Sequence, residues 1–423
     1  MKYEILKLKN GMKIIVCFCP NFSSVYFDFA IKTGSVFENS KNNGLAHSVE
    51  HLVSKKAISN KKEKDQWLKK YIIHNFRGYT LQDRINFELV AHKKDLKTAF
   101  NILVKILKPL KITFQEMATE KEIILDEFLA YQDNPYFLFD RFVKQNYYKN
   151  NSLKFDALGT KNNIKKFNSP DVKDFINKYF IGENIILTIA GDVSIKEIKN
   201  QINNRLSFLN KKNYNKLDEL KKFSYQGNSF NFKEYDCQQD YFGYYYPIFN
   251  KSAEDNVKWE FFIEILNNYL FYNLTKKVGC YFVDTNVRTF KEFINFSIES
   301  SFDPSKTVAF YLNLQKEIIS FKKNFNSNSF EQFKREKIIS LGLELDYPKE
   351  QSNMIAWYAL MFGSDKILTI SDQQEIIKST KFKDIKIFFN QLFEDKKGSV
   401  FIMGDGAENK EKKLYSIWQK WQV

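Results

Sequence analysis

The sequence predicts an α+β protein made of two similar α/β units in tandem. Three observations lead to this fold class. The chain has 423 residues, more than one simple hydrophobic core normally holds. Segments rich in β-branched residues alternate with long amphipathic helical patterns, which is typical of layered α/β architectures. Finally, the second half of the sequence repeats parts of the first.

The repeat is visible as two matches at nearly constant offsets. Residues 329–337 match 113–121 at an offset of 216, and residues 384–393 match 171–180 at an offset of 213. Each member of the second pair is followed by a strand-like run that ends in Gly-Asp. A duplicated unit of about 210 residues explains both matches, because shorter solenoid repeats have periods of 20–50 residues.

The elements of the first unit follow from local patterns. We expect strands at 13–19, 24–32 and 84–91, and helices at 94–108 and 114–131. A further helix should begin at Ser169-Pro170-Asp171, which supplies a cap, a proline in the first turn and then an acid.

The division into domains follows from the repeat. Residues 1–209 form the first domain and residues 230–423 the second. Residues 210–229 form a linker, because they are polar, rich in Lys and Asn, and without a clear period. All four histidines lie in the first 92 residues, so any histidine-based metal chemistry belongs to the first domain.

Composition and charge exclude several classes. The net charge of +15 is spread along the chain without an RNA- or DNA-binding signature, so we expect no nucleic-acid partner. No run of 18 apolar residues is present, and we expect no membrane span. The start lacks the apolar region of a signal peptide, and the four cysteines do not form a disulfide framework. A cytoplasmic protein fits these features.

Residues 47–51, His-Ser-Val-Glu-His, carry the most specific chemistry. On a helix His47 and His51 lie one turn apart on one face, so both imidazoles can reach one tetrahedral Zn²⁺. Glu50 then sits beside the metal, where it can take a proton from zinc-bound water, as in the H-x-x-E-H motif of inverted zinc peptidases. The alternative is a solvated helix surface on which Glu50 pairs with a lysine of the next turn.

A catalytic zinc needs one more protein ligand, usually a carboxylate, and an open position for water. The acid-rich segment 116–127 offers Glu116, Glu120 and Glu127, which are spaced by four and seven residues and share one face of a helix. Periodicity does not choose among the three.

At this point the chain resembles the insulinase/pitrilysin-type zinc peptidases, which include mitochondrial processing peptidase and many bacterial relatives. The resemblance extends over essentially the whole chain, and its motifs stand in family order: Asn10-Gly11, Thr33-Gly34-Ser35, Gly44–Leu52, Glu120–Glu127 with Asp133-Asn134-Pro135, and Ile189–Asp192. It implies one zinc ion per chain, held by His47, His51 and Glu120, with Glu50 as general base. Glu127 and Glu116 are implied to support the ligands or the structure around them.

The resemblance also implies a more detailed fold and a partner. Each processing-peptidase-like unit should be a mostly antiparallel sheet backed by helices, and the second unit should be an inactive homologue without the zinc motif. Two such units form half of a clam shell around an unfolded peptide. Because this chain supplies only two units, a dimer is expected, and the chain looks most like the bacterial processing-type members.

Two departures from the family pattern concern the substrate. Relatives carry Asn-Ala-x-Thr on the strand that aligns the peptide, whereas this chain has Arg-Gly-Tyr-Thr, so Arg77, Tyr79 and Thr80 are the expected substrate-binding residues there. The family's clamp is an Arg followed seven residues later by a Tyr, and this chain has Leu274 and Tyr281 at those positions. In heterodimeric relatives the partner of the zinc subunit provides the clamp. We therefore expect the catalytic subunit of a heterodimer, with a homodimer as the alternative.

The expected activity is that of a zinc-dependent endopeptidase that hydrolyses unfolded or short peptides in a closed chamber. The alternative is a non-catalytic scaffold or partner subunit of the same fold. The intact motif argues against the scaffold, because a scaffold has no need for a base beside the metal.

Overall fold

The protein is described as a computed structural model that covers residues 2–58, 75–149, 151–202, 205–209, 224–249, 252–290, 293–344, 346–394, 397–406 and 409–420. Residues 210–223 of the linker expected at 210–229 therefore lie outside the described residues. The chain divides into two compact units. Unit 1 comprises Met1–Asp133, Asn151–Lys222 and Leu343–Ile370, and unit 2 comprises Asn134–Asn150, Phe223–Gly342 and Ser371–Val423.

Unit 1 is built on a six-stranded sheet. Its strands are β1 (Lys2–Lys7), β2 (Lys13–Phe18), β3 (Ser24–Ile31), β4 (Phe76–Thr80), β5 (Ile85–His92) and β6 (Ile185–Gly191). They lie in the order β1-β2-β6-β3-β5-β4, and every neighbouring pair is antiparallel except the parallel pair β2–β6. Strand β4 pairs with β5 alone, so within the described residues it forms one edge of the sheet.

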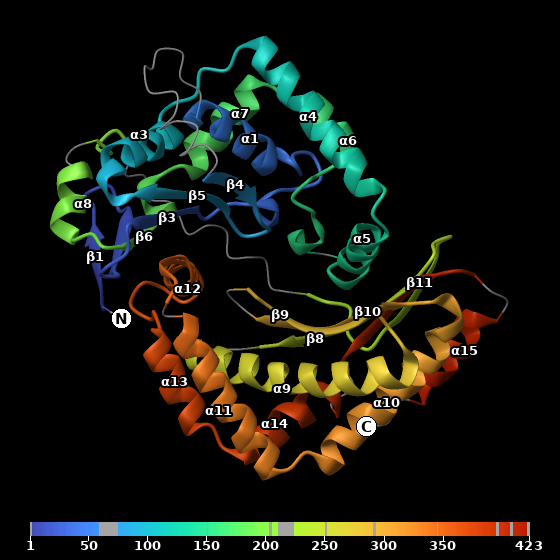
Figure 1. Ribbon diagram of the computed structural model, residues 1–423. Coiled ribbons are helices and arrows are strands. Elements are labelled where there is room, and N and C mark those ends of the chain that lie inside the picture. The colour runs from blue at the N-terminus through green and yellow to red at the C-terminus, as the bar shows by residue number, and fades with distance from the viewer. Residues whose placement is uncertain are drawn as a thin grey trace. The chain divides into compact units, whose positions relative to one another are not determined.

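Helices cover both faces of this sheet. They are α1 (Leu45–Ile58), α3 (Leu96–Leu107), α4 (Phe114–Gln132), α6 (Lys161–Lys166), α7 (Ser169–Tyr179), α8 (Ile195–Ile202) and α12 (Pro348–Met361). Alternation along β3 sends Val25, Phe27 and Phe29 to one face, where they share a core with α1 and α3 (Figure 1). On the other face, the Tyr26 hydroxyl donates to Asn353 of α12 at 3.0 Å.

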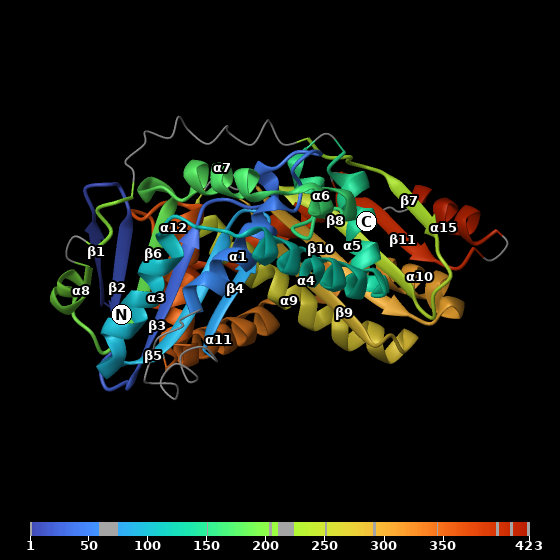
Figure 2. The same ribbon diagram turned by 90° about the horizontal axis from the view of Figure 1, so that it is seen from above.

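Unit 2 repeats this plan with a five-stranded sheet. Its strands are β7 (Phe230–Glu234), β8 (Asp240–Ile248), β9 (Phe282–Thr289), β10 (Ile294–Phe302) and β11 (Ser399–Gly404), in the order β7-β11-β8-β10-β9 with only β7–β11 parallel. Its helices are α5 (Pro135–Tyr147), α9 (Ala253–Val278), α10 (Thr307–Asn324), α11 (Ser327–Glu344), α13 (Ile370–Ser379), α14 (Phe382–Phe393) and α15 (Lys410–Gln419). Helix α9 runs along one face of the sheet (Figures 1 and 2). On α5, the Phe139 ring stacks on Tyr241 of β8.

The expected fold of two α+β units in tandem is confirmed. The matched segments form the same elements in both halves, since α4 corresponds to α11 and α7 to α14, and each of the latter pair precedes a strand, β6 or β11. Each unit also takes a helix from the other half of the sequence. Helix α12 belongs to unit 1, and α5, which lies inside the expected first domain 1–209, belongs to unit 2. None of the helices among the described residues has the length and apolar content needed to cross a membrane.

Candidate metal centre and active site

Helix α1 carries the H-x-x-E-H motif, and its first turn is anchored by a buried acid. The Glu38 carboxylate accepts hydrogen bonds from the backbone N–H groups of Gly44 at 2.9 Å and Ala46 at 2.7 Å. A carboxylate at this position satisfies free N–H groups and complements the helix dipole. Burial raises the pKa of Glu38 to about 7. The apolar residues of α1 turn into the core: Leu45, Val49, Leu52, Val53 and Ala57. This leaves the motif on the opposite flank of the helix.

Helix α4 supplies the acids that face this flank. It begins with a capping box in which the Thr113 hydroxyl accepts from the Glu116 N–H and the Glu116 carboxylate accepts from the Thr113 N–H. Its buried side includes Glu120, which is only 5 % exposed. The same side therefore carries carboxylates as well as apolar residues toward α1.

Two lysines of α1 set the register between the helices. Lys56 pairs with Glu116 at 2.6 Å, and Lys55 pairs with Glu120. Residues later in α1 thus pair with residues earlier in α4, as expected for antiparallel helices. The same antiparallel register places Glu127 opposite the two histidines, which lie nearer the start of α1.

The resulting cluster is a three-donor site. His47 Nε2 lies 3.6 Å and His51 Nε2 lies 3.4 Å from Glu127 Oε2, and the three donor atoms all lie within 4.8 Å of one another. Zn–N bonds of about 2.0–2.1 Å in a tetrahedron separate neighbouring ligand atoms by about 3.4 Å. The donor set and its spacing therefore fit a zinc ion with one coordination position left for water.

This geometry does not group Glu120, the third ligand that the family resemblance implies, with both histidines. Glu120 lies 3.6 Å from His51 Nδ1, the ring nitrogen that does not face Glu127, and its carboxylate is paired with Lys55. It is thus placed to hold the His51 ring, as acids behind metal ligands commonly do. The structure brings Glu127, and not Glu120, together with both histidines. Glu116 accepts a hydrogen bond from Lys56 and lies farther from the histidines.

The electrostatics of the cluster favour neutral imidazole at His47. Burial, and then the neighbouring His51, lower the pKa of His47 to about 4. Burial alone would lower the pKa of His51, but Glu127 and the nearby charge of Glu50 outweigh it and raise that pKa. The hydrogen bond from His51 lowers the pKa of Glu127. An anionic carboxylate beside a neutral histidine is the state in which both bind metal.

Glu50 lies beside the cluster and against strand β4. It is 5 % exposed, accepts a hydrogen bond from the Ser54 hydroxyl at 2.9 Å, and has a pKa raised by burial. A Cβ at Gly78 of β4 would lie 2.2 Å from Glu50 Oε1 and 2.4 Å from Ser54 Oγ. The strand can approach the carboxylate this closely because residue 78 has no side chain. Sequence reasoning singled out the neighbours of Gly78 and missed the glycine itself.

The other residues expected to bind substrate divide between the two units. On β4, Arg77 is exposed, the Tyr79 hydroxyl donates to Glu88 at 2.8 Å, and Thr80 Oγ1 is buried without a hydrogen-bond partner among the described residues. Tyr281 belongs to unit 2, where its side chain is 86 % exposed. Leu274 of α9 is fully buried. The structure thus groups the β4 residues with Glu50 in one unit and leaves Tyr281 in the other.

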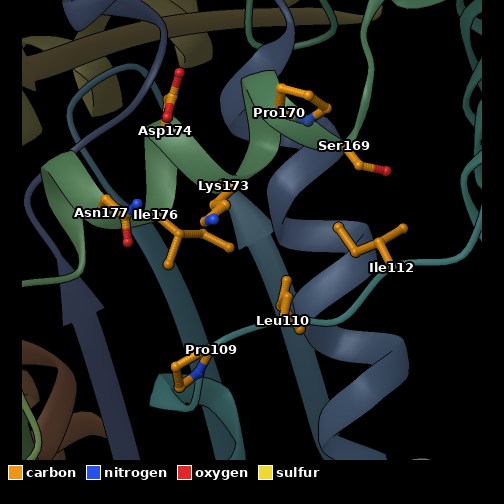
Figure 3. Close-up of a pocket in the computed structure, with 9 residues that line it drawn as sticks. All are labelled: Pro109, Leu110, Ile112, Ser169, Pro170, Lys173, Asp174, Ile176 and Asn177. Atoms are coloured by element: carbon orange, nitrogen blue, oxygen red, sulfur yellow. The ribbon is translucent and has the colours of Figure 1, made fainter.

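A separate cavity of about 570 Å³ lies in unit 1 between the segment before α4 and the first turns of α7. Figure 3 shows its lining residues, among them Leu110, Ile112, Pro170 and Lys173. Neither the histidines of α1 nor the acids of α4 line it, so it is distinct from the metal cluster.

Fold and site together define an α+β protein whose first unit carries an inverted zinc-peptidase helix. Two family descriptions match the chain: "Insulinase (Peptidase family M16)" over residues 20–161 and "Peptidase M16 inactive domain" over residues 166–337. The chain belongs to the insulinase family, peptidase family M16.

Individual relatives agree with this assignment. An "uncharacterized zinc protease" of Rickettsia felis is 25% identical over 404 residues, which is 95% of this chain and 97% of that protein. The beta subunit of the mitochondrial-processing peptidase of Bos taurus is 31% identical over 172 residues, which covers 40% of this chain and 34% of the subunit. Among solved structures, a protease from Helicobacter pylori superposes with a TM-score of 0.84 at 17% identity, covering 95% of this chain and 99% of that one. At that identity the superposition establishes the fold.

Proposed function

We propose that the protein is a zinc-dependent endopeptidase that hydrolyses unfolded or short peptides. The observation that carries the proposal is the placement of Glu50. This buried carboxylate with a raised pKa adjoins the His47–His51–Glu127 cluster on one side and an edge strand on the other. A general base beside a metal, within reach of a strand that can hold a peptide, is the arrangement that amide hydrolysis needs.

Each residue of the proposed active site has its own role. His47, His51 and Glu127 would hold one zinc ion per chain, and zinc bound there would polarise the scissile carbonyl and lower the pKa of water. Glu50 receives a proton and passes it to the leaving amine, and its raised pKa brings it closer to the operating pH. Glu120 keeps the His51 ring in place through Nδ1.

The free edge of β4 is the proposed platform for the substrate. Its backbone N–H and C=O groups on that edge have no strand partner among the described residues, so an extended peptide can add to the sheet there. Helix α1 packs along β4, which holds this edge next to Glu50. Recognition through the peptide backbone would make the enzyme tolerant of many sequences.

We further propose that a second family subunit completes the chamber. Leu274 is buried at the position where the family resemblance implies a clamp arginine, so this chain would need a partner that supplies the clamp, as in a heterodimer. The chain also matches 50% of the length of the periplasmic protease PqqL of Escherichia coli, and that longer chain would be equivalent to two copies of this architecture. A homodimer, in which exposed Tyr281 serves both chambers, is the alternative. Size-exclusion chromatography with light scattering, followed by co-purification, separates the two assemblies.

A cytoplasmic location is proposed from the cysteines. All four are free, including Cys17 and Cys19, whose sulfur atoms lie 3.9 Å apart without a disulfide. Cell fractionation tests the location, and recovery of the protein outside the cytoplasm would overturn it.

The test of the function is hydrolysis of a mixed library of quenched peptides, with zinc content measured on the same sample. Glu50→Gln should lower kcat by at least about 10²-fold, because a general base contributes 10²–10⁴-fold, while zinc content stays unchanged. Glu122→Gln, an exposed residue of α4, is the matched control and should change neither quantity.

A non-catalytic scaffold is the second candidate, favoured by the buried Leu274. It predicts zinc without hydrolysis even in the presence of the co-purified partner, and no effect of Glu50→Gln on any function of the complex.

A further inference from the structure

We propose that Arg77 makes the enzyme select peptides by charge: it favours a substrate that presents a carboxylate opposite it on the edge of β4. The inference rests on the proposed function, because it specifies the substrate class of the same site.

Arg77 is an exposed cation on the edge strand β4. Its side chain is exposed, and no hydrogen bond or ion pair to its guanidinium occurs in the described part of the chain. Two other cations near this sheet are paired, Arg84 with Asp83 at 3.0 Å and Lys93 with Asp192 at 2.6 Å. A guanidinium held on an edge strand without a partner is free to bind an anion on an incoming strand.

The acid across from Arg77 is already engaged. Glu88 of β5 is the cross-strand neighbour of Arg77, but its carboxylate accepts a hydrogen bond from the Tyr79 hydroxyl at 2.8 Å. The other acid on this face of the sheet, Asp28, is 3 % exposed and bound by Asn86 at 2.6 Å. Neither acid forms an ion pair with the arginine, and Arg77 is an exposed charge beside the edge of β4.

Strand geometry fixes where the selected carboxylate would lie. Arg77 and Tyr79 project to one face of the sheet, while Gly78 between them faces Glu50 on the other. A peptide residue directly opposite Arg77 would have its Cβ about 4.5–5.5 Å away on the same face. Because the next residue of β4 touches the general base, the selected position lies within a residue or two of the scissile bond. Arginine binds a carboxylate through two parallel N–H bonds, which makes the preference geometric as well as electrostatic.

The carboxylate can come from an acidic side chain or from the C-terminus of the peptide. The first series of probes therefore consists of C-terminally amidated, quenched peptides in which one position at a time is Glu, Gln or Lys. A second series keeps Gln at all scanned positions and carries a free C-terminus at varied distance from the cleaved bond. A preference confined to the second series assigns the arginine to the terminal carboxylate.

The expected result is one position at which kcat/KM for Glu exceeds that for Gln by about two- to fivefold at low salt, the effect of one exposed ion pair. The ratio should fall to one in Arg77→Gln, favour Lys in Arg77→Glu, and shrink at high salt. Lys97→Gln removes the same charge from an exposed position on α3 and should leave the ratio unchanged. Equal Glu-to-Gln ratios in the wild-type protein and Arg77→Gln, or a wild-type preference for Lys, would overturn the proposal.

Failure of the proposed function gives a different result. If no form of the protein cleaves any peptide, alone or with its co-purified partner, the peptidase assignment fails, and binding still decides the role of Arg77. Fluorescence anisotropy on Glu50→Gln, with and without Arg77→Gln, measures the affinities for the same peptides. If Glu50→Gln binds the Glu peptide more tightly than the Gln peptide and the double variant does not, charge selection is supported. Equal affinities of Glu50→Gln for the two peptides refute it.

Discussion

Replacing Glu127 and Glu120 in turn by Gln tests which acid completes the metal centre. Both residues lie on the same face of α4 and contact His51, but only Glu127 also faces His47. Each substitution removes one negative charge and keeps the size of the side chain. Glu127→Gln loses the contacts with both histidines, and Glu120→Gln loses the contact with His51 and the pair with Lys55.

The expected magnitudes follow from these contacts. Structural zinc sites with four ligands bind with about 10–16 kcal/mol, or roughly 2.5–4 kcal/mol per ligand, so loss of Glu127 should weaken zinc binding by about 10²–10³-fold. Loss of Glu120 removes the group that orients His51, and such changes typically cost about 10–100-fold. Glu116→Gln, whose partner is Lys56, should leave zinc affinity unchanged.

The assay is competition for zinc with a chromophoric chelator at a fixed pH, with circular dichroism to show that each variant is folded. The predicted order of zinc affinities is wild type, Glu116→Gln, Glu120→Gln and Glu127→Gln, with the first two equal. A greater loss in Glu120→Gln than in Glu127→Gln would refute the assignment and restore the ligand set implied by the family resemblance.

Three further predictions concern other contacts. A Cβ at Gly78 would fall 2.2 Å from Glu50 Oε1, so Gly78→Ala should lower kcat on the order of 10²-fold with zinc retained. In a protein that already carries the shorter Glu50→Asp, the same substitution should cause no further loss of kcat. A full additional loss in the double variant would contradict this. Lys410 pairs with Asp240, which is fully buried, so Lys410→Met should cost about 3–5 kcal/mol in urea unfolding, and a cost below about 1 kcal/mol would argue against the pair. Burial raises the pKa of Asp28 from 3.8 to about 7, so its proton stabilises the fold below about pH 4 and this contribution is lost as pH rises through 7. Relative to Asp28→Asn, the wild-type protein should therefore lose up to about 4 kcal/mol of unfolding free energy between about pH 4 and 8, and parallel stability curves would exclude this titration.

Local patterns were sufficient for the elements predicted in the first unit. The strand expected at 24–32 is β3, and the helix expected at 114–131 is α4, because alternation and the 3.6-residue period report directly on which face is buried. The histidine pair is also a local feature, since it needs only that residues 47–51 be helical, as they are in α1.

Contacts between distant segments could not be read in the same way. Gln351 of α12 accepts hydrogen bonds from the thiols of Cys17 and Cys19, more than 330 residues earlier in the chain, and no local pattern indicates which sheet a helix will cover. The assignment of α5 to unit 2 is a second case. Both are decided by tertiary packing.

The third ligand depends on a register between two helices, which explains why the sequence left it open. Glu116, Glu120 and Glu127 share a face, and sliding α4 by one or two turns would present a different acid to the histidines. Lys55 and Lys56 were the available signal. They lie one turn beyond His51 on α1 and form ion pairs with Glu120 and Glu116, so Glu127 is the acid that remains for the histidines. The lysines become informative once the helices are known to be antiparallel.

The second unit shows that this architecture does not depend on a metal. It contains no histidine, yet it forms the corresponding strands and helices around a core that includes Leu266 and Leu270 of α9. The fold of unit 1 should likewise rest on its apolar core and not on its zinc ligands. Variants of His47 or Glu127 are therefore expected to stay folded, so a loss of zinc or of activity in them can be attributed to the site itself.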